Sequence, residues 1–295
     1  MIRIFGIILI SIFFLGCEVK ENRPIVVSTN LWIGYSPLYY ANKRGWLRQN
    51  NVKLVRTVSL GESFDTFAKG SADVFCGTQY EIRKFCSSDD KTDSVILLNR
   101  SNGGDMILSN LSIEELKSQE KIDVYLELDS VNLSLFEYFK NKYSFGDSQI
   151  NFIDKTPDIS SKLRMKQTAT IIVTYSPYNL SLVKNGYKEI ASTRDTDLLV
   201  LDAIYIKSDT VEKFPQEIDR LNFLVAKSLS DLKSNPKEYF NLINEEFRFE
   251  NYDEFREALS SIEWIYDNHS IVAKQRKILP NHKKPNLIKP YQIGG

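Results

Sequence analysis

The sequence predicts an α/β protein of two lobes, each built on a parallel-type sheet covered by helices. Short β-branched runs alternate with helical patterns from Ile25 onward, an order typical of parallel strands joined by crossover helices. Two longer extended segments, 101–108 and 194–206, are the natural places for the chain to pass between lobes. The length of 295 residues allows one large or two medium domains.

The charge balance argues against a nucleic-acid partner. Lys and Arg number 38 and Asp and Glu number 38, so no basic surface is expected. The chain also has no repeat of solenoid length and no low-complexity tract. These features are typical of an ordinary globular body.

Residues 1–17 have the pattern of an export signal. Arg3 is a minimal basic region, and 4–15 is a nearly unbroken apolar run that ends at Gly16-Cys17. A small residue before cysteine resembles a bacterial lipobox, in which Cys17 is lipidated and becomes the mature N-terminus. A plain signal peptide or a membrane anchor is the alternative. Residues 18–24 would form a tether, and no later segment is apolar enough to cross a bilayer.

Export places the remaining cysteines, Cys76 and Cys86, in an oxidising compartment if the organism is Gram-negative. The two residues can pair, although Cys76 ends a predicted strand and Cys86 lies well into the next helix. Otherwise both are small buried apolar residues. The sequence leaves these alternatives open.

The stretch 28–40 organises the first lobe. The run 25–27 predicts a buried strand, and Ser36-Pro37 predicts the start of a helix. Trp32 and Tyr35 lie between them, at a junction where open α/β sheets bind ligands. The alternative is that both rings belong to the core.

The other predicted elements follow in order. A capping box at Ser112 and Glu115 predicts a helix start. Helical spacing begins at Thr210, with a break at Pro215. The remaining strands are expected at 52–58, 72–76, 95–98, 106–108, 122–126, 150–153, 169–174, 187–191 and 198–206. The remaining helices are expected at 61–69, 79–85, 131–143, 159–166, after Pro236 and at 252–262, followed by an irregular tail from 279.

Catalytic chemistry is not indicated. The two histidines, His269 and His282, lack metal-ligand spacing and are expected on the surface. No nucleophile elbow, P-loop, dinucleotide fingerprint or zinc-protease motif occurs. Polar residues at several strand ends without a catalytic set predict binding without turnover, with no metal and no cofactor.

Six segments together resemble the solute-binding proteins of ABC importers of the nitrate/sulfonate/taurine type (NMT1/THI5-like). Among them, Thr78, Glu81, Asp105 and Asp202 match residues of the family pattern. The segments are 32–47, 59–78, 77–85, 97–108, 173–193 and 198–206, with departures at Tyr80, Asn99 and Ser176.

The resemblance implies a two-lobe periplasmic-binding-protein fold of type II, with the ligand cleft between the lobes. Lobe 1 would comprise 25–104 and 203–295, and lobe 2 would comprise 105–202. The implied protein is a monomer on the periplasmic or cell-surface side of a bacterial membrane, anchored by lipid. It would bind a small molecule by hinge closure and deliver it to an ABC permease and its ATPase.

The same resemblance gives candidate ligand-binding residues. Each carboxylate among them has a helix cap or a hinge hydrogen bond as its alternative role. The candidates are Trp32, Tyr35, Ser59, Thr78, Glu81, Asp105, Tyr175, Ser176 and Asp202.

The ligand class stays open between sulfonate, taurine or nitrate and a thiamine-precursor type of compound. An anion site needs arginine or several N–H donors. The candidate loops instead carry carboxylates and tyrosines, with Arg83 and Arg100 unplaced, which favours a neutral or amine-bearing organic ligand. One alternative function is a sensor lobe for a membrane signalling protein. Another is an enzyme like the fungal thiamine-pyrimidine synthase, disfavoured by the lack of a site histidine and a cysteine cluster.

Overall fold

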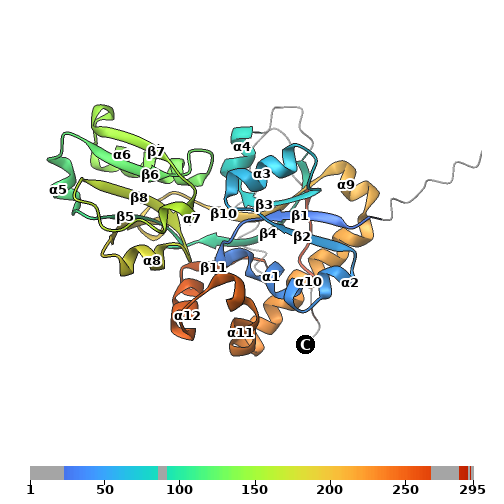
Figure 1. The fold of residues 1–295 in the computed structure, drawn as a ribbon. Helices are drawn as coiled ribbons and strands as arrows, with labels where there is room; N and C mark the ends of the chain where they lie inside the picture. Colours follow the sequence, from blue (N-terminus) through green and yellow to red (C-terminus); the bar gives the residue numbers. More distant parts are fainter. Residues whose placement is uncertain (1–22, 86–91, 267–285, 292, 294–295) are drawn as a thin grey trace, which may run out of the picture.

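The computed structural model describes residues 23–85, 92–266, 286–291 and 293, and it forms two α/β lobes side by side (Figure 1). We call the lobe that contains both ends of the described chain lobe 1 and the other lobe 2. The strands of lobe 1 are β1 (Ile25–Thr29), β2 (Val52–Arg56), β3 (Val74–Thr78), β4 (Thr92–Ser101), β10 (Leu201–Lys207), β11 (Ile262–Trp264) and β12 (Asn286–Leu287). The strands of lobe 2 are β5 (Asp105–Ser109), β6 (Ile122–Leu126), β7 (Ile150–Asp154), β8 (Thr170–Tyr175) and β9 (Lys188–Ser192).

Both sheets are mixed, so the prediction of parallel-type sheets was wrong in part. In lobe 1 the order is β11-β4-β10-β3-β1-β2, with β12 also paired to β4. Strand β1 is parallel to β2 and β3, whereas β10 is antiparallel to β3 and β4. The reason is connectivity: the chain leaves lobe 1 at the end of β4 and returns through β10, which therefore runs the opposite way.

Lobe 2 repeats this arrangement with the order β7-β6-β8-β5-β9. Strand β6 is parallel to β7 and β8, whereas β5 is antiparallel to β8 and β9. Strand β5 enters directly from lobe 1, so again the crossing strand is the antiparallel one. Its residues and those of β8 are buried, which explains the strong β-branched run at 170–174.

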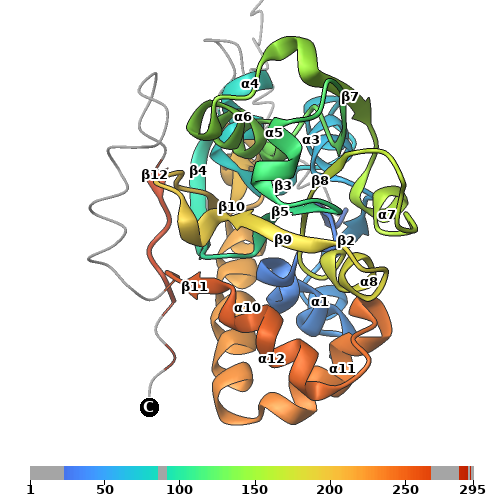
Figure 2. The same cartoon turned by 90° about the vertical axis from the view of Figure 1, so that its left-hand side faces the viewer.

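The helices of lobe 1 begin where the sequence signals predict. Helix α1 starts at Ser36 with Pro37 in its first turn, and Pro215 and Pro236 begin α10 and α11. The C-terminal helices pack around α1 below the sheet (Figure 2). The helices are η1 (Ile33–Tyr35), α1 (Ser36–Lys43), α2 (Trp46–Gln49), α3 (Leu60–Ala68), α4 (Gln79–Phe85), α9 (Ser208–Lys213), α10 (Pro215–Ser234), α11 (Pro236–Phe247) and α12 (Tyr252–Ser260).

The helices of lobe 2 include one clear departure from prediction. The capping box at Ser112 is present, but the helix expected over 159–166 ends at Ser160. The carbonyls of Arg164 and Lys166 accept hydrogen bonds from the side chains of Tyr187 and Asn110 and are not used in a helix. The elements are α5 (Ile113–Lys117), α6 (Val131–Tyr143), η2 (Asp147–Gln149), α7 (Pro157–Ser160), α8 (Asn179–Lys184) and η3 (Thr193–Asp195).

The two crossings between the lobes are hydrogen-bonded to each other. Thr193, on the return crossing, contacts the Ser101 hydroxyl at 2.8 Å and accepts from the Gly103 amide at 2.8 Å through its Oγ1. The Ser101 amide also donates to the Val200 carbonyl at 3.0 Å. The connection between the lobes is therefore a single bonded unit.

Several sequence predictions fall outside the described residues. These are the signal segment with Cys17, most of the tether, Cys86, both histidines and most of the tail. Cys76 is a buried free cysteine within the described part. A search of the described helices finds none with the length and apolarity needed to span a bilayer.

Candidate functional site

A small cavity lies between the two sheets. Its volume is about 10 Å³, and it is lined from lobe 1 and lobe 2 together. Such a volume holds about one water-sized group. The lining residues are Asn30, Trp32, Leu60, Thr78, Asp105, Tyr175 and Asp202. We call this space the inner cavity.

Strand register positions the polar residues of the inner cavity. Asp202 pairs with Thr78 across β10 and β3, and Asp105 pairs with Tyr175 across β5 and β8. One cross-strand pair from each sheet therefore reaches the same space. Asn30 follows the end of β1, at the edge of the sheet where α/β proteins place ligand contacts.

Asp202 is the most strongly perturbed carboxyl of the inner cavity. Its Oδ1 accepts a hydrogen bond from the Tyr35 hydroxyl at 2.7 Å, whereas Oδ2 forms no regular hydrogen bond among the described residues, although the Trp32 side chain also acts on this carboxyl as a donor. Burial raises the pKa of Asp202 well above its usual value, and the neighbouring Asp105 charge raises it further. An unpaired carboxylate here would be costly, so the group favours either a proton or a cationic partner.

Two further buried carboxyls titrate near neutrality. Burial raises the pKa of Asp105 to about 7, although the Ser101 hydroxyl opposes the shift. Burial likewise raises the pKa of Glu127 to about 7, opposed by the Gly61 amide. No Lys, Arg or His is among the leading influences on the pKa values of these two groups.

Three hydrogen bonds, two of them buried and one partly buried, join the lobes around the inner cavity. The side-chain amide nitrogen of Asn30, Nδ2, donates to the Tyr175 hydroxyl at 2.7 Å. The Gly61 amide donates to Glu127 Oε1 at 2.7 Å, and the Val131 amide donates to Glu81 Oε1 at 2.7 Å. The lobes are therefore closed on each other through direct polar contacts.

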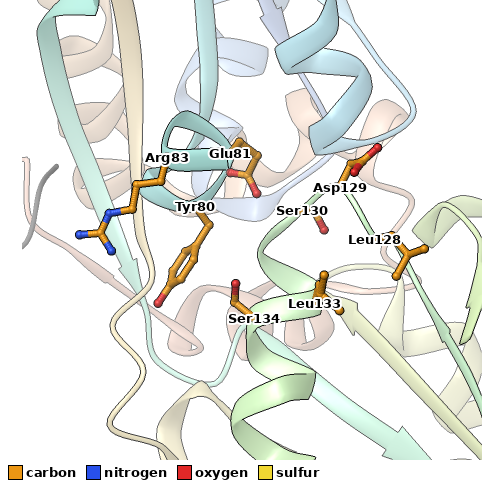
Figure 3. Close-up of a pocket in the computed structure, with 8 residues that line it drawn as sticks. All are labelled: Tyr80, Glu81, Arg83, Leu128, Asp129, Ser130, Leu133 and Ser134. Atoms are coloured by element: carbon orange, nitrogen blue, oxygen red, sulfur yellow. The ribbon is translucent and has the colours of Figure 1, made fainter. Parts of the chain in front are cut away.

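A larger pocket of about 290 Å³ adjoins this closed region. The lining residues Tyr80, Glu81 and Arg83 belong to α4, and residues of α6 and of the segment before it face that helix (Figure 3). Glu81 lines this outer pocket and bonds through Oε2 to Thr78, which lines the inner cavity. The outer pocket and the inner cavity are therefore adjacent. The remaining lining residues are Leu128, Asp129, Ser130, Leu133 and Ser134.

The structure brings together five of the nine candidates from the sequence. Trp32, Thr78, Asp105, Tyr175 and Asp202 line the inner cavity. Glu81 lines the outer pocket beside it.

The other three candidates lie behind the lining. Tyr35 is fully buried and donates its hydroxyl to Asp202. Ser59 caps α3 by accepting from the Glu62 amide. Ser176 is buried, and its amide donates to the Gly104 carbonyl.

Sequence reasoning missed Asn30 and Glu127. Each directly follows the end of a strand, β1 or β6, and this position is the signal that would have found them. Within the described residues no group of three or more His, Cys, Asp or Glu is arranged to hold a metal ion.

Known proteins are similar to this chain in structure but not detectably in sequence. No family model matches the sequence, and no curated protein matches it. The alkanesulfonate-binding protein SsuA from Xanthomonas axonopodis pv. citri, solved with MOPS, superposes with a TM-score of 0.68 at 9% identity, covering 90% of this chain and 98% of its own.

Two further solved structures show the same similarity. The periplasmic aliphatic sulphonate-binding protein SsuA from Escherichia coli superposes with a TM-score of 0.64 at 12% sequence identity, covering 89% of this chain and 95% of its own. The periplasmic nitrate-binding protein NrtA from Synechocystis PCC 6803 superposes with a TM-score of 0.61 at 15% sequence identity, covering 79% of this chain and 69% of its own. The chain therefore has the fold of the periplasmic binding proteins, as the sequence predicted.

Proposed function

We propose that the chain is an extracytoplasmic solute-binding protein that closes its lobes on a small molecule and delivers it to an ABC permease. The observation that carries the proposal is the inner cavity, which residues of both lobes line and where buried polar atoms of lobe 1 are poorly satisfied by the protein. Asn30 Oδ1 is buried there without a hydrogen bond to the described residues, and Trp32 Nε1 and Asp202 Oδ2, which act on each other, form no regular hydrogen bond among them. Buried polar atoms are costly when unsatisfied, and a bound solute would satisfy them.

The proposed ligand contacts are the polar and aromatic residues that line the inner cavity. Trp32 and Tyr175, whose ring centroids lie 5.8 Å apart at 90°, would wall the solute. Thr78, Asp105 and Asp202 would bind its polar groups. Tyr35, Ser59, Ser176 and Glu81 would position these residues or the lobes.

Anchoring and delivery are part of the same proposal, supported by the signal-like segment at 1–17 and by the shared fold. Lipidation at Cys17 would hold a monomeric body on the outer side of a bacterial membrane, beside the permease and ATPase. The structural neighbours named above are binding proteins, which supports a role in binding without turnover.

Hydrogen exchange tests the proposal on the full-length chain in mild detergent. The Gly61 and Val131 amides bond across the cleft only when the lobes are closed. A small-molecule extract or compound library that contains the solute should slow exchange at both amides, because the ligand favours closure. Exchange at the Asp123 amide, which bonds within lobe 2, serves as the control. Unchanged exchange at both cleft amides with every compound would contradict the proposal.

A further inference from the structure

The two helices that begin at the cleft already hold carboxyl groups supplied by the chain itself. Helix α3 of lobe 1 receives Glu127 from lobe 2 at its Gly61 amide, and α6 of lobe 2 receives Glu81 from lobe 1 at its Val131 amide. A helix N-terminus favours a negative group because its free N–H groups and dipole are positive. These two positions are therefore occupied by Glu81 and Glu127 and are closed to an anionic solute.

The inner cavity is left with an excess of acceptors. Asn30 Oδ1 is buried without a partner, Asp202 Oδ2 has only the Trp32 indole as a nearby donor and forms no regular hydrogen bond, and the Asp105 side chain lines the same space. Both aspartates are less than 5% exposed, and Asn30 is fully buried. No Lys, Arg or His lines the inner cavity among the described residues.

The aromatic walls fit the same kind of ligand. Trp32 packs edge-on against Tyr175, and Tyr175 packs edge-on against Tyr178 at 5.4 Å. The faces of such rings carry negative charge density and attract cations. Aromatic walls are thus compatible with a positive group, and the acceptors favour one.

We infer that the cleft binds a small organic cation, whose ammonium group is held by Asp105, Asp202 and the Asn30 side-chain carbonyl, with Trp32 and Tyr175 as its walls. This inference rests on the proposed solute-binding function and names its ligand class. An ammonium group has three N–H donors and matches three acceptors. The chain would thus differ from its structural neighbours, which are named for sulfonate and nitrate.

The space available agrees with this assignment. The inner cavity of about 10 Å³ suits a group of the size of water, such as an ammonium head. The outer pocket of about 290 Å³ begins at Glu81, one hydrogen bond away from Thr78. The body of the ligand would extend toward that pocket as the lobes adjust.

The test compares amines with sulfonates of the same carbon skeleton. Benzylamine is matched with phenylmethanesulfonate, and butylamine with butanesulfonate, by calorimetry on the full-length chain. We expect an amine to bind at least about tenfold more tightly than its matched sulfonate, because the sulfonate meets buried carboxylates. A sulfonate that binds more tightly than its amine, or no amine binding at about 10 mM, would overturn the inference.

Two variants locate the cation. Asp202→Asn and Asp105→Asn should each weaken amine binding at least about tenfold, with folding checked by circular dichroism. Asp209→Asn, on an exposed helix of lobe 1, is the control and should leave affinity unchanged. Unaltered amine affinity in both site variants would also overturn the inference.

Hydrogen exchange separates this inference from the proposed function. A sulfonate that slows exchange at Gly61 and Val131 would leave solute binding by closure intact while refuting the cation. Failure of every compound and extract to slow that exchange would refute the proposed function itself.

Discussion

Glu81 and Glu127 form a reciprocal pair across the cleft, because each carboxylate accepts a hydrogen bond from the first turn of a helix in the opposite lobe. The two bonds, to the Val131 and Gly61 amides, are both 2.7 Å long. A carboxyl oxygen at a helix N-terminus satisfies an amide that has no partner within the helix. Closure without ligand is thereby stabilised by the protein itself.

Replacing Glu81 by glutamine should shift the lobes toward the open state. Its Oε2 accepts from both the amide and the hydroxyl of Thr78, and an amide nitrogen cannot accept these bonds while Oε1 also serves Val131. We expect a loss of about 1–3 kcal/mol from closure. The measurement is hydrogen exchange at Val131, which should become faster. Glu257→Gln, on the exposed face of α12, should leave exchange unchanged, and equal rates in the two variants would contradict the assignment.

The ligand-free protein should lose stability as the pH rises from 5 to 8. The pKa values of Asp105 and Glu127 are about 7 in the folded protein and near 4 when unfolded, so between these values the folded state binds more protons. Each group therefore lowers the free energy of unfolding by up to about 1.4 kcal/mol per pH unit, until the pH passes 7.

Thermal unfolding at pH 5 and pH 8 measures this dependence. Asp105 is faced by Glu81, Asp202, Tyr80 and Tyr175, whose charges act on it or respond to it. Asp105→Asn should flatten the pH dependence by removing one titrating group. A melting temperature that rises toward pH 8 in the parent protein would show that these carboxyls are not destabilised by burial.

Gly104→Ala should disturb the indole at the inner cavity. A Cβ at Gly104 would lie 2.2 Å from Trp32 Cη2 and 3.1 Å from the Ser261 carbonyl, so the ring has to move. We expect a destabilisation of about 1–3 kcal/mol and altered tryptophan fluorescence. Urea unfolding with fluorescence detection measures both. At Gly146 the nearest side-chain atom would lie at 3.5 Å, so Gly146→Ala is the control.

Cys17→Ser should release the protein from the membrane fraction. If Cys17 carries the lipid, its loss removes the acyl chains that hold the body to the bilayer. The measurement is fractionation of cells that express the parent or the variant. Cys86→Ser should leave the distribution unchanged, and a variant that stays with the membrane would instead favour an uncleaved anchor.

Local signals predicted the elements well, because short-range chemistry determines where they begin. Ser36-Pro37 and the Ser112 capping box mark helix starts in the structure as they did in the sequence. The helix expected over 159–166 failed because carbonyls there bond to Asn110 and Tyr187, which are distant in sequence. The prediction of strand direction failed for a similar reason, because the direction of β10 depends on how the chain returns from lobe 2.

The sequence likewise predicted some residues of the candidate site and missed others. Trp32, Asp105 and Asp202 were identified from strand ends and family pattern, and they do share one cavity. Asn30 and Glu127 gain their importance only from contacts with the other lobe, to Tyr175 and Gly61. Single-sequence reasoning does not show which strand ends of two lobes meet.

The Thr193 hydroxyl ties the outgoing crossing to the returning one. Two crossings bound in this way are expected to move together, and we expect the lobes to rotate about one shared hinge. One reporter distance across the cleft would then describe the whole motion, and its amplitude would give the opening angle directly.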